Sequence, residues 1–246
     1  MQEGKKMTVY THTEKKKGIG QTLSSYAAAM VPRFIPNKML LTFLDILCRL
    51  QRFLPDSGKR HLRKNDRAFL RHLPVIRDKN GYIEDQGTYA DLHYGKVHMA
   101  YAGCEIIAVY NALRFLSPYS HPSLPALIRD FEKDGMVLSG HFGTSPKALA
   151  RYLKILGHTV EIATDESAFP ALTDSCTCLL LTYYNDKRDI FKEIHTICLT
   201  KEKDGWHAHN LYCDGKPVIF SENTKDFLSE INGGQAKGIA MIGISG

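Results

Sequence analysis

The chain has 246 residues, of which 43% are hydrophobic and 24% charged, as in an ordinary globular protein with one sizeable core. The formal net charge of +6 is unevenly distributed. Residues 1–95 carry 17 Lys and Arg against 9 Asp and Glu, whereas residues 96–246 carry 15 against 17. This asymmetry predicts two regions with different roles, a basic extension over residues 1–90 and a domain over residues 91–246.

The number and spacing of the cysteines argue against a protein that is stabilised by disulfide bonds or by a structural zinc ion. The six thiols are too sparse for a disulfide framework, and Cys176 and Cys178 are one residue apart, which is not a structural zinc spacing. The start of the chain is polar and basic, without the apolar core of a secretory signal. We therefore expect reduced thiols, a cytoplasmic location and no metal or other cofactor.

The N-terminal third begins with a polar, Lys-rich stretch over residues 1–20, which we interpret as a solvated tail. Residues 38–54 then have apolar side chains at helical spacing, interrupted by charged residues, which predicts an amphipathic helix and excludes a membrane-spanning one. The repeated positions are Leu40, Phe43, Leu44, Leu47, Leu50 and Leu54. The apolar face needs a cover. We expect the rest of the protein to provide it, with a peripheral membrane surface or a partner protein as alternatives.

Residues 57–80 are strongly basic and end in the turn signal Asp78-Lys79-Asn80-Gly81. The cationic side chains are Lys59, Arg60, Arg63, Lys64, Arg67, Arg71, Arg77 and Lys79. No sequence signature of a nucleic-acid-binding fold accompanies them, so we interpret this stretch as a solvated helix face and expect no nucleic-acid partner.

From residue 92 onward, helices come first and strands follow, which predicts an α+β fold. Helices are expected over 104–117, 123–133 and 146–157, the last with Ser145 as N-cap, Pro146 in the first turn and Gly157 at the end. Strands are expected over 159–163, 178–184, 194–200, 206–212, 216–220 and 238–244, with a short helix over 224–231.

Cys104 opens the first of these helices, directly after Ala102-Gly103. A thiol at a helix N-terminus meets unpaired backbone N–H groups and the positive end of the helix dipole, which both favour the nucleophilic thiolate. Gly103 leaves room for a substrate to approach the sulfur. The alternative is a small buried cysteine that packs beneath a core helix.

A nucleophilic cysteine needs a base, usually His, and a group that orients the imidazole. The turn signal Asp204-Gly205 predicts a hairpin between strands 194–200 and 206–212. A turn centred near residue 203 places His195 beside Asn210 and Leu211. The Asn210 side chain is thereby expected to hold the tautomer of His195.

Four segments in this order resemble the papain-like cysteine peptidases. They are Ala102-Gly103-Cys104, Gly143-Thr144-Ser145-Pro146, His195 and Asn210. Within that group, the chain is most similar to the bacterial double-glycine, bacteriocin-processing peptidases and their stand-alone relatives. The resemblance covers roughly residues 92–246. It implies a papain-like core, a peptide or protein substrate, no metal, and a Cys104–His195–Asn210 triad.

Two positions depart from that family. Glu105 stands where the family usually has Gly, and His98 stands where the family has the Gln that donates to the oxyanion. His98 is then the expected oxyanion donor, together with backbone amides. A non-catalytic papain-like binding module, and a thiol acyltransferase or amidase acting on a non-protein substrate, remain alternative functions.

Three further features carry weaker hypotheses. His207 and His209 alternate onto one strand face and form at most a minor metal-site candidate. Cys198 and Cys213 are expected near each other as free thiols. The stretch Leu228, Ile231, Gly233 and Gly234 resembles the end of a double-glycine leader but is more typical of a helix that ends in Gly.

Overall fold

The computed structural model describes residues 35–51, 61–186, 194–212 and 214–245. It confirms the predicted α+β class, with eight α-helices and a six-stranded antiparallel sheet within these residues. The α-helices are α2 Asn37–Gln51, α3 Leu62–Asp78, α4 Met99–Ala102, α5 Cys104–Leu116, α6 Leu124–Lys133, α7 Pro146–Ile155, α8 Phe169–Ser175 and α9 Phe227–Glu230. Short 3₁₀ turns are η2 Gln86–Tyr89, η3 Leu138–Gly140, η4 Glu166–Ala168 and η6 Ile231–Gly234.

The main sheet has the strand order β3-β8-β4-β5-β6-β7, and all neighbouring strands are antiparallel. A separate two-stranded hairpin, β1 and β2, precedes α4. The strands are β1 His93–Tyr94, β2 Val97–His98, β3 Thr159–Ala163, β4 Cys178–Tyr184, β5 Ile194–Glu202, β6 Gly205–His209, β7 Val218–Phe220 and β8 Lys237–Ser245. The last strand thus enters the centre of the sheet, between β3 and β4.

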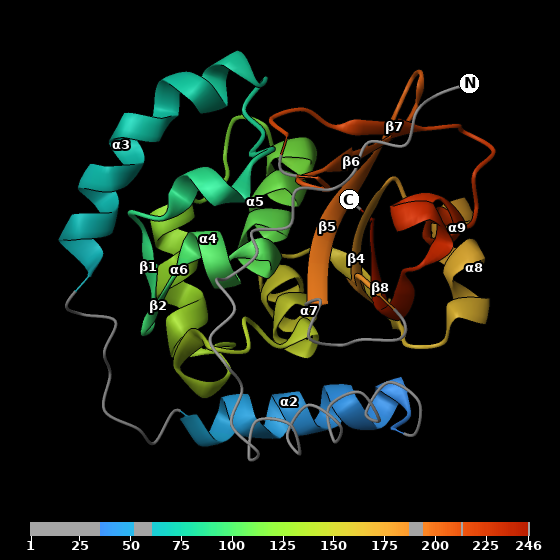
Figure 1. Cartoon of the computed structure of the whole chain (residues 1–246), viewed down its shortest axis with the longest axis horizontal. Coiled ribbons are helices and arrows are strands. Elements are labelled where there is room, and N and C mark those ends of the chain that lie inside the picture. The colour runs from blue at the N-terminus through green and yellow to red at the C-terminus, as the bar shows by residue number, and fades with distance from the viewer. Residues whose placement is uncertain (1–34, 52–60, 187–193, 213, 246) are drawn as a thin grey trace, which may run out of the picture.

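Helices cover both faces of the sheet (Figure 1), and each face has its own hydrophobic core. Cys178 and Leu180 of β4 pack with the α5, α6 and α7 side, whereas Leu179 and Leu181 pack with α8 and α9. Because side chains alternate along a strand, β4 is buried on both faces, and its sequence is correspondingly apolar throughout. The prediction of an apolar strand over 178–184 is confirmed.

The helix that begins at Cys104 is also confirmed. Ten consecutive α5 residues, Cys104 to Leu113, are buried, so this helix lies inside the molecule rather than on its surface. Its interior polar residue, Asn111, is satisfied by two hydrogen bonds of 2.9 Å to the backbone N–H and C=O of Ile83. These bonds tie the middle of α5 to the segment before η2, and α5 also packs against β5.

The basic helix α3 packs on the rest of the protein through Ala68, Phe69 and Ile76, which belong to the same core as α5. Asn65 adds hydrogen bonds of 2.8 and 2.9 Å to the backbone of His93. This part of the predicted N-terminal extension therefore packs against the C-terminal region. The division of the chain near residue 90 stays a prediction, and Lys59, Arg60 and the 1–20 tail lie outside the described residues.

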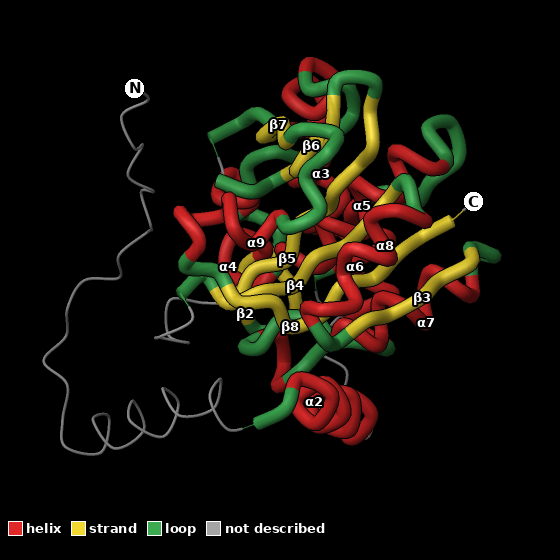
Figure 2. Tube along the Cα trace, turned by 90° about the vertical axis from the view of Figure 1, so that its right-hand side faces the viewer, coloured by secondary structure: helices red, strands yellow, loops and turns green. Residues whose placement is uncertain are grey.

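Helix α2 lies along the lower edge of the molecule in Figures 1 and 2. The expectation that the protein covers its apolar face is wrong for Phe43 and Leu50, which are exposed. The inward side is instead built around Leu41, Asp45 and Cys48. Leu54 lies outside the described residues.

Two local predictions need correction. Ser145 occupies the N-cap position of α7, but its hydroxyl makes no capping bond and has no hydrogen-bond partner among the described residues. The helix expected over 224–231 is only one turn long, because Asn232, Gly233 and Gly234 adopt positive φ angles that end it. In the part of the chain that the structure describes, no helix combines the length and the apolar content needed to cross a bilayer.

Candidate active site

Cys104 is the first residue of α5, and its sulfur lies close enough to the backbone N–H of Thr196 on β5 for that group to lower the pKa of the thiol. The structure therefore brings the thiol beside the residue that directly follows His195. Gly103 at the N-cap has a packing role, and its predicted role in leaving room for a substrate stays a prediction. A side chain there would overlap with Met99, its Cβ lying 2.5 Å from the Met99 carbonyl oxygen, so Gly103 permits close packing of α4 on α5.

The thiol is protonated in this environment. Burial raises the pKa of Cys104 well above its ordinary value, and the neighbouring Glu105 carboxyl raises it further. The Cys104 S–H donates to Glu105 Oε2 at 3.3 Å. The nearby Thr196 backbone N–H acts in the opposite direction and lowers the pKa, because a backbone N–H close to the sulfur favours the thiolate.

Glu105 is itself buried, and burial raises its carboxyl pKa from 4.5 to about 7. The backbone N–H of Thr144 lies near this carboxylate and favours its charged form. Gly143 leaves the space that the Glu105 carboxylate occupies, because it has no side chain. It has φ +61, and a Cβ there would lie 2.6 Å from Glu105 Oε1. The Gly143-Thr144 turn thus lies against the carboxylate, which is partly protonated near neutral pH, while the Cys104 thiol keeps its proton.

His195 is held in one tautomer by its backbone neighbour. Its Nε2 lies 2.7 Å from the backbone carbonyl oxygen of Asn210, and a carbonyl can only accept, so Nε2 carries the proton. Burial lowers the pKa of His195 below its ordinary 6.5, which favours the neutral ring. The neutral ring then has Nδ1 as an unprotonated acceptor, which is what a general base requires.

Asn210 is close to His195 as predicted, but through its carbonyl rather than its side chain. The hairpin register explains this difference: Cys198 pairs with His209, so continuing the ladder would set His195 opposite Tyr212. The ladder ends at His209 instead, and Asn210 turns away with φ +60, which aims its carbonyl at His195. The Asn210 amide group bonds Gln86, with Oδ1 accepting from the Gln86 backbone N–H at 2.9 Å.

A buried network that the sequence reasoning missed fixes this turn. Glu84 accepts from the Asn210 backbone N–H at 2.9 Å and lies 2.6 Å from His209 Nδ1. Thr200 Oγ1 lies 3.0 Å from the other ring nitrogen of His209. Gln86 completes the link by donating to the Ala100 carbonyl of α4 at 3.2 Å. The loop before α4 therefore ties the His195 side of the site to the Cys104 side.

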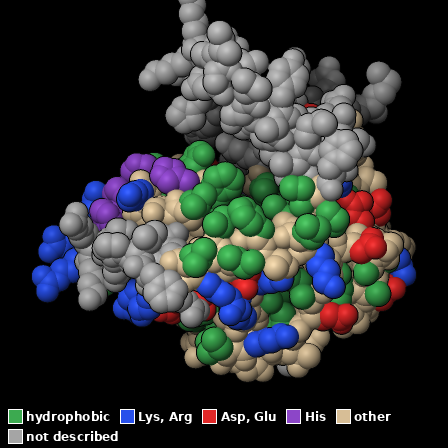
Figure 3. Space-filling view, turned by 90° about the horizontal axis from the view of Figure 1, so that it is seen from below, with side chains coloured by type: hydrophobic (Ala, Val, Ile, Leu, Met, Phe, Trp, Pro, Cys, Tyr) green, Lys and Arg blue, Asp and Glu red, His purple; other side chains and the backbone are tan. Residues whose placement is uncertain are grey.

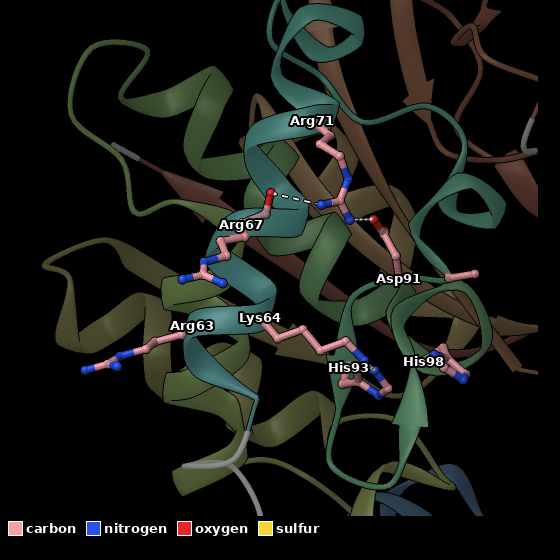
Figure 4. Close-up of a pocket in the computed structure, with 8 residues that line it drawn as sticks. Arg63, Lys64, Arg67, Arg71, Asp91, His93 and His98 are labelled. Carbon is pink, nitrogen blue, oxygen red and sulfur yellow. Dashed lines mark hydrogen bonds and ion pairs between the residues drawn. The ribbon is translucent and has the colours of Figure 1, made fainter.

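His98, the predicted oxyanion donor, is exposed and lines a basic groove of about 690 Å³ together with Lys64 and His93 (Figure 4). Its ring centroid is 4.8 Å from that of His93, whose Nε2 lies 2.8 Å from Lys64 Nζ. Among the described residues, no hydrogen bond or ring contact joins His98 to Cys104. Its oxyanion role stays a prediction.

The remaining candidates have other partners. His207 Nε2 lies 2.8 Å from Asp204 Oδ1, and His209 is committed to Glu84 and Thr200, so the two imidazoles serve separate networks. Within the described ranges, no group of three or more His, Cys, Asp and Glu side chains is arranged to hold a metal ion. Cys198 neighbours Cys178 across β4 and β5, and Cys213 lies outside the described residues.

No family model matches the chain. The search of curated proteins and the search of solved structures likewise give no match. The peptidase resemblance therefore rests on the residues described above.

Proposed function

We propose that the protein is a thiol-dependent hydrolase of papain-like type, with Cys104 as nucleophile and His195 as general base. The observation that supports this most is the tautomer of His195, since its Nε2 proton is fixed by the Asn210 carbonyl and Nδ1 is free to accept. The contact between the Cys104 sulfur and the Thr196 amide adds support, because it joins the nucleophile to the strand that carries the base.

In the proposed reaction, the Cys104 sulfur attacks a substrate carbonyl carbon while His195 Nδ1 takes the thiol proton. The carbon–nitrogen bond then breaks, and His195 returns the proton to the leaving amine. A water molecule hydrolyses the resulting thioester, with His195 again acting as base. Backbone N–H groups in the first turn of α5 are available for the oxyanion, because the first turn of a helix leaves its N–H groups without intrahelical partners.

The substrate class that we propose is a peptide or protein, following the resemblance to double-glycine peptidases, and the location that we propose is the cytoplasm. The triad chemistry serves amides generally, so a thiol acyltransferase or amidase would use the same residues in the same roles. Neither alternative requires a metal or another cofactor.

One observation favours a second candidate, a non-catalytic papain-like binding module. The Cys104 proton points to Glu105 Oε2, and the pKa of the thiol is raised, so the resting sulfur is a poor nucleophile. In this alternative, the Cys104–Glu105 pair is a structural hydrogen bond in the interior of the protein.

Peptide-library hydrolysis followed by mass spectrometry separates the two candidates. The proposal predicts cleavage by the full chain that is lost in Cys104→Ala and His195→Ala, with unchanged circular dichroism. Cys176→Ala is the matched control, because this buried thiol lies at the C-terminal end of α8 and packs against β8. Cleavage that survives in Cys104→Ala, or no cleavage by the parent chain across the library, would reject the hydrolase proposal.

A further inference from the structure

Helix α2 presents an apolar strip to the outside of the molecule. Met39, Phe43, Ile46 and Leu50 recur at helical spacing and are each 50 to 64% exposed. Large apolar side chains scattered singly on a surface are normal, but four in register along one helix form a continuous strip. At a rise of 1.5 Å per residue, the 15-residue helix is about 22 Å long.

The attachment of α2 to the protein is largely polar. Asp45 is buried and ion-paired with both Arg49 and Arg151 of α7. Lys147 Nζ donates to Thr42 Oγ1 at 2.9 Å, and Asn37 donates to two backbone carbonyls at 3.0 Å. These contacts fix the rotation of the helix about its axis and direct the strip outward.

A neighbouring loop enlarges the same apolar surface. Turn η3 contacts α2, and its Leu138 is 47% exposed, while Phe142 beyond it is exposed as well. Figure 3, which views the molecule from the α2 side, shows hydrophobic side chains gathered on this face, with Lys and Arg among and beside them and carboxylates at the right-hand edge and among the cations below. In Figure 2, α2 lies at the lower edge of the molecule, outside the sheet and the other helices.

Two lysines add positive charge beside the strip. Asp45 and Asp134 are ion-paired with arginines, whereas Lys38 and Lys147 form no ion pair with an acid among the described residues. An apolar ridge flanked by Lys and Arg is the arrangement of an interfacial helix, whose apolar side chains enter the headgroup region while the cations meet anionic lipids.

We infer that α2 is a peripheral membrane-docking helix, which places Met39, Phe43, Ile46 and Leu50 in the interface of a bilayer that contains anionic lipids. The inference is independent of the hydrolase proposal, because none of these residues belongs to the Cys104 site. The helix lies on the membrane surface and does not span the bilayer, in agreement with the charged residues that interrupt its apolar sequence.

Co-sedimentation of the full chain with lipid vesicles tests this inference. Vesicles of phosphatidylcholine with 30% phosphatidylglycerol are compared with pure phosphatidylcholine. We expect binding to the anionic vesicles, at least a tenfold lower partition coefficient for Phe43→Ser/Ile46→Ser, and a reduced preference for anionic lipid in Lys38→Gln/Lys147→Gln. Leu70→Ser on α3 removes an equally exposed leucine elsewhere and should bind like the parent.

Three results would overturn the inference. The first is no binding of the parent to anionic vesicles, and the second is an equal loss of vesicle binding in Leu70→Ser and in Phe43→Ser/Ile46→Ser. The third is a lower stability of the Phe43→Ser/Ile46→Ser variant. If Phe43→Ser/Ile46→Ser lowers the melting temperature by several degrees, the strip packs against protein and is not a membrane face. Light scattering of the parent and this variant identifies a second copy as the cover, because a dimer would then dissociate into monomers. An unchanged melting temperature together with lost vesicle binding supports the inference.

Discussion

At the scale of single residues, the positions of two protons matter for the proposed hydrolysis: the one on His195 and the one on the Cys104 thiol. His195 has its Nε2 proton fixed by a carbonyl, and Cys104 has its proton directed at Glu105. Activity in the proposed mechanism therefore requires the thiol proton to turn from Glu105 to His195 Nδ1. Burial is the largest cause of the raised thiol pKa, and Glu105 raises it further.

The raised pKa of Glu105 leads to a stability prediction with a defined sign. A carboxyl whose pKa rises from 4.5 to about 7 on folding stabilises the protein fully below pH 4.5 and loses this contribution as the pH rises through 7. Glu105→Gln has no such loss. Its unfolding free energy relative to the parent should therefore rise from pH 4.5 to 7, by about 1–3 kcal/mol. Urea unfolding across this pH range measures the difference.

The same substitution should make the thiol more reactive. Removing the Glu105 charge removes one cause of the raised Cys104 pKa, so alkylation at pH 8 should be faster in Glu105→Gln than in the parent. Glu222→Gln, an exposed position, is the control for both measurements and should change neither. A Glu105→Gln variant that is less stable at pH 8 and no more reactive would contradict this view of the pair.

Asn210 provides a second prediction at this scale. Since the carbonyl, not the amide side chain, holds His195, Asn210→Gly keeps the acceptor and tolerates the φ of +60. We expect peptide hydrolysis within about tenfold of the parent in Asn210→Gly, and a lower melting temperature in Asn210→Ala, where a left-handed conformation costs roughly 1 kcal/mol. Hydrolysis in Asn210→Gly that falls as far as in His195→Ala would show that the side chain is essential.

At the scale of elements, the N-cap serines of α6 and α7 occupy the same helix position, but only the serine of α6 makes a capping hydrogen bond. Ser123 Oγ accepts from the Ala126 N–H at 3.4 Å, whereas Ser145 Oγ is buried without a partner among the described residues. Ser123→Ala should therefore lose about 0.5–1 kcal/mol of stability, as caps usually do, and Ser145→Ala should be neutral or stabilising. Urea unfolding of both variants tests this. A loss above 1 kcal/mol in Ser145→Ala would reveal a partner for its hydroxyl.

Elements with a strong local signal were predictable. Helix α5 and strand β4 have continuous apolar patterns, and their first residues, Cys104 and Cys178, match the expectations. The rotation of α2 was not predictable from periodicity, because its apolar arc is wide enough to be buried in more than one way. The ion pair of Asp45 with Arg151, which lies 106 residues away in sequence, selects the observed orientation.

The site was predictable only in part, for a similar reason. The hairpin signal placed Asn210 near His195, but a one-residue difference in register and the early end of β6 changed which Asn210 group makes the contact. Glu84 and Gln86 carry no local motif, and their partner Asn210 is 126 and 124 residues distant. Such long-range polar contacts follow from the folded arrangement and not from local sequence.

At the scale of the whole molecule, the N-terminal segments contribute unequally to the fold. Phe69 and Ile76 of α3 and Ile83 in the following loop belong to the core around α5, while α2 buries mainly Leu41. A chain that begins at residue 61 should therefore fold, and one that begins at residue 91 should be insoluble or lack a cooperative thermal transition. Circular dichroism melting compares the two. Equal melting temperatures would show that α3 is dispensable.

The most direct test of the central claim is the pH dependence of Cys104 alkylation by iodoacetamide, followed by mass spectrometry in the parent chain and in His195→Ala. If His195 Nδ1 accepts the thiol proton, the parent rate rises through an inflection below pH 6.5, and this inflection is absent in His195→Ala, where only the raised thiol pKa remains. Identical profiles in the two proteins would contradict a Cys104–His195 catalytic pair.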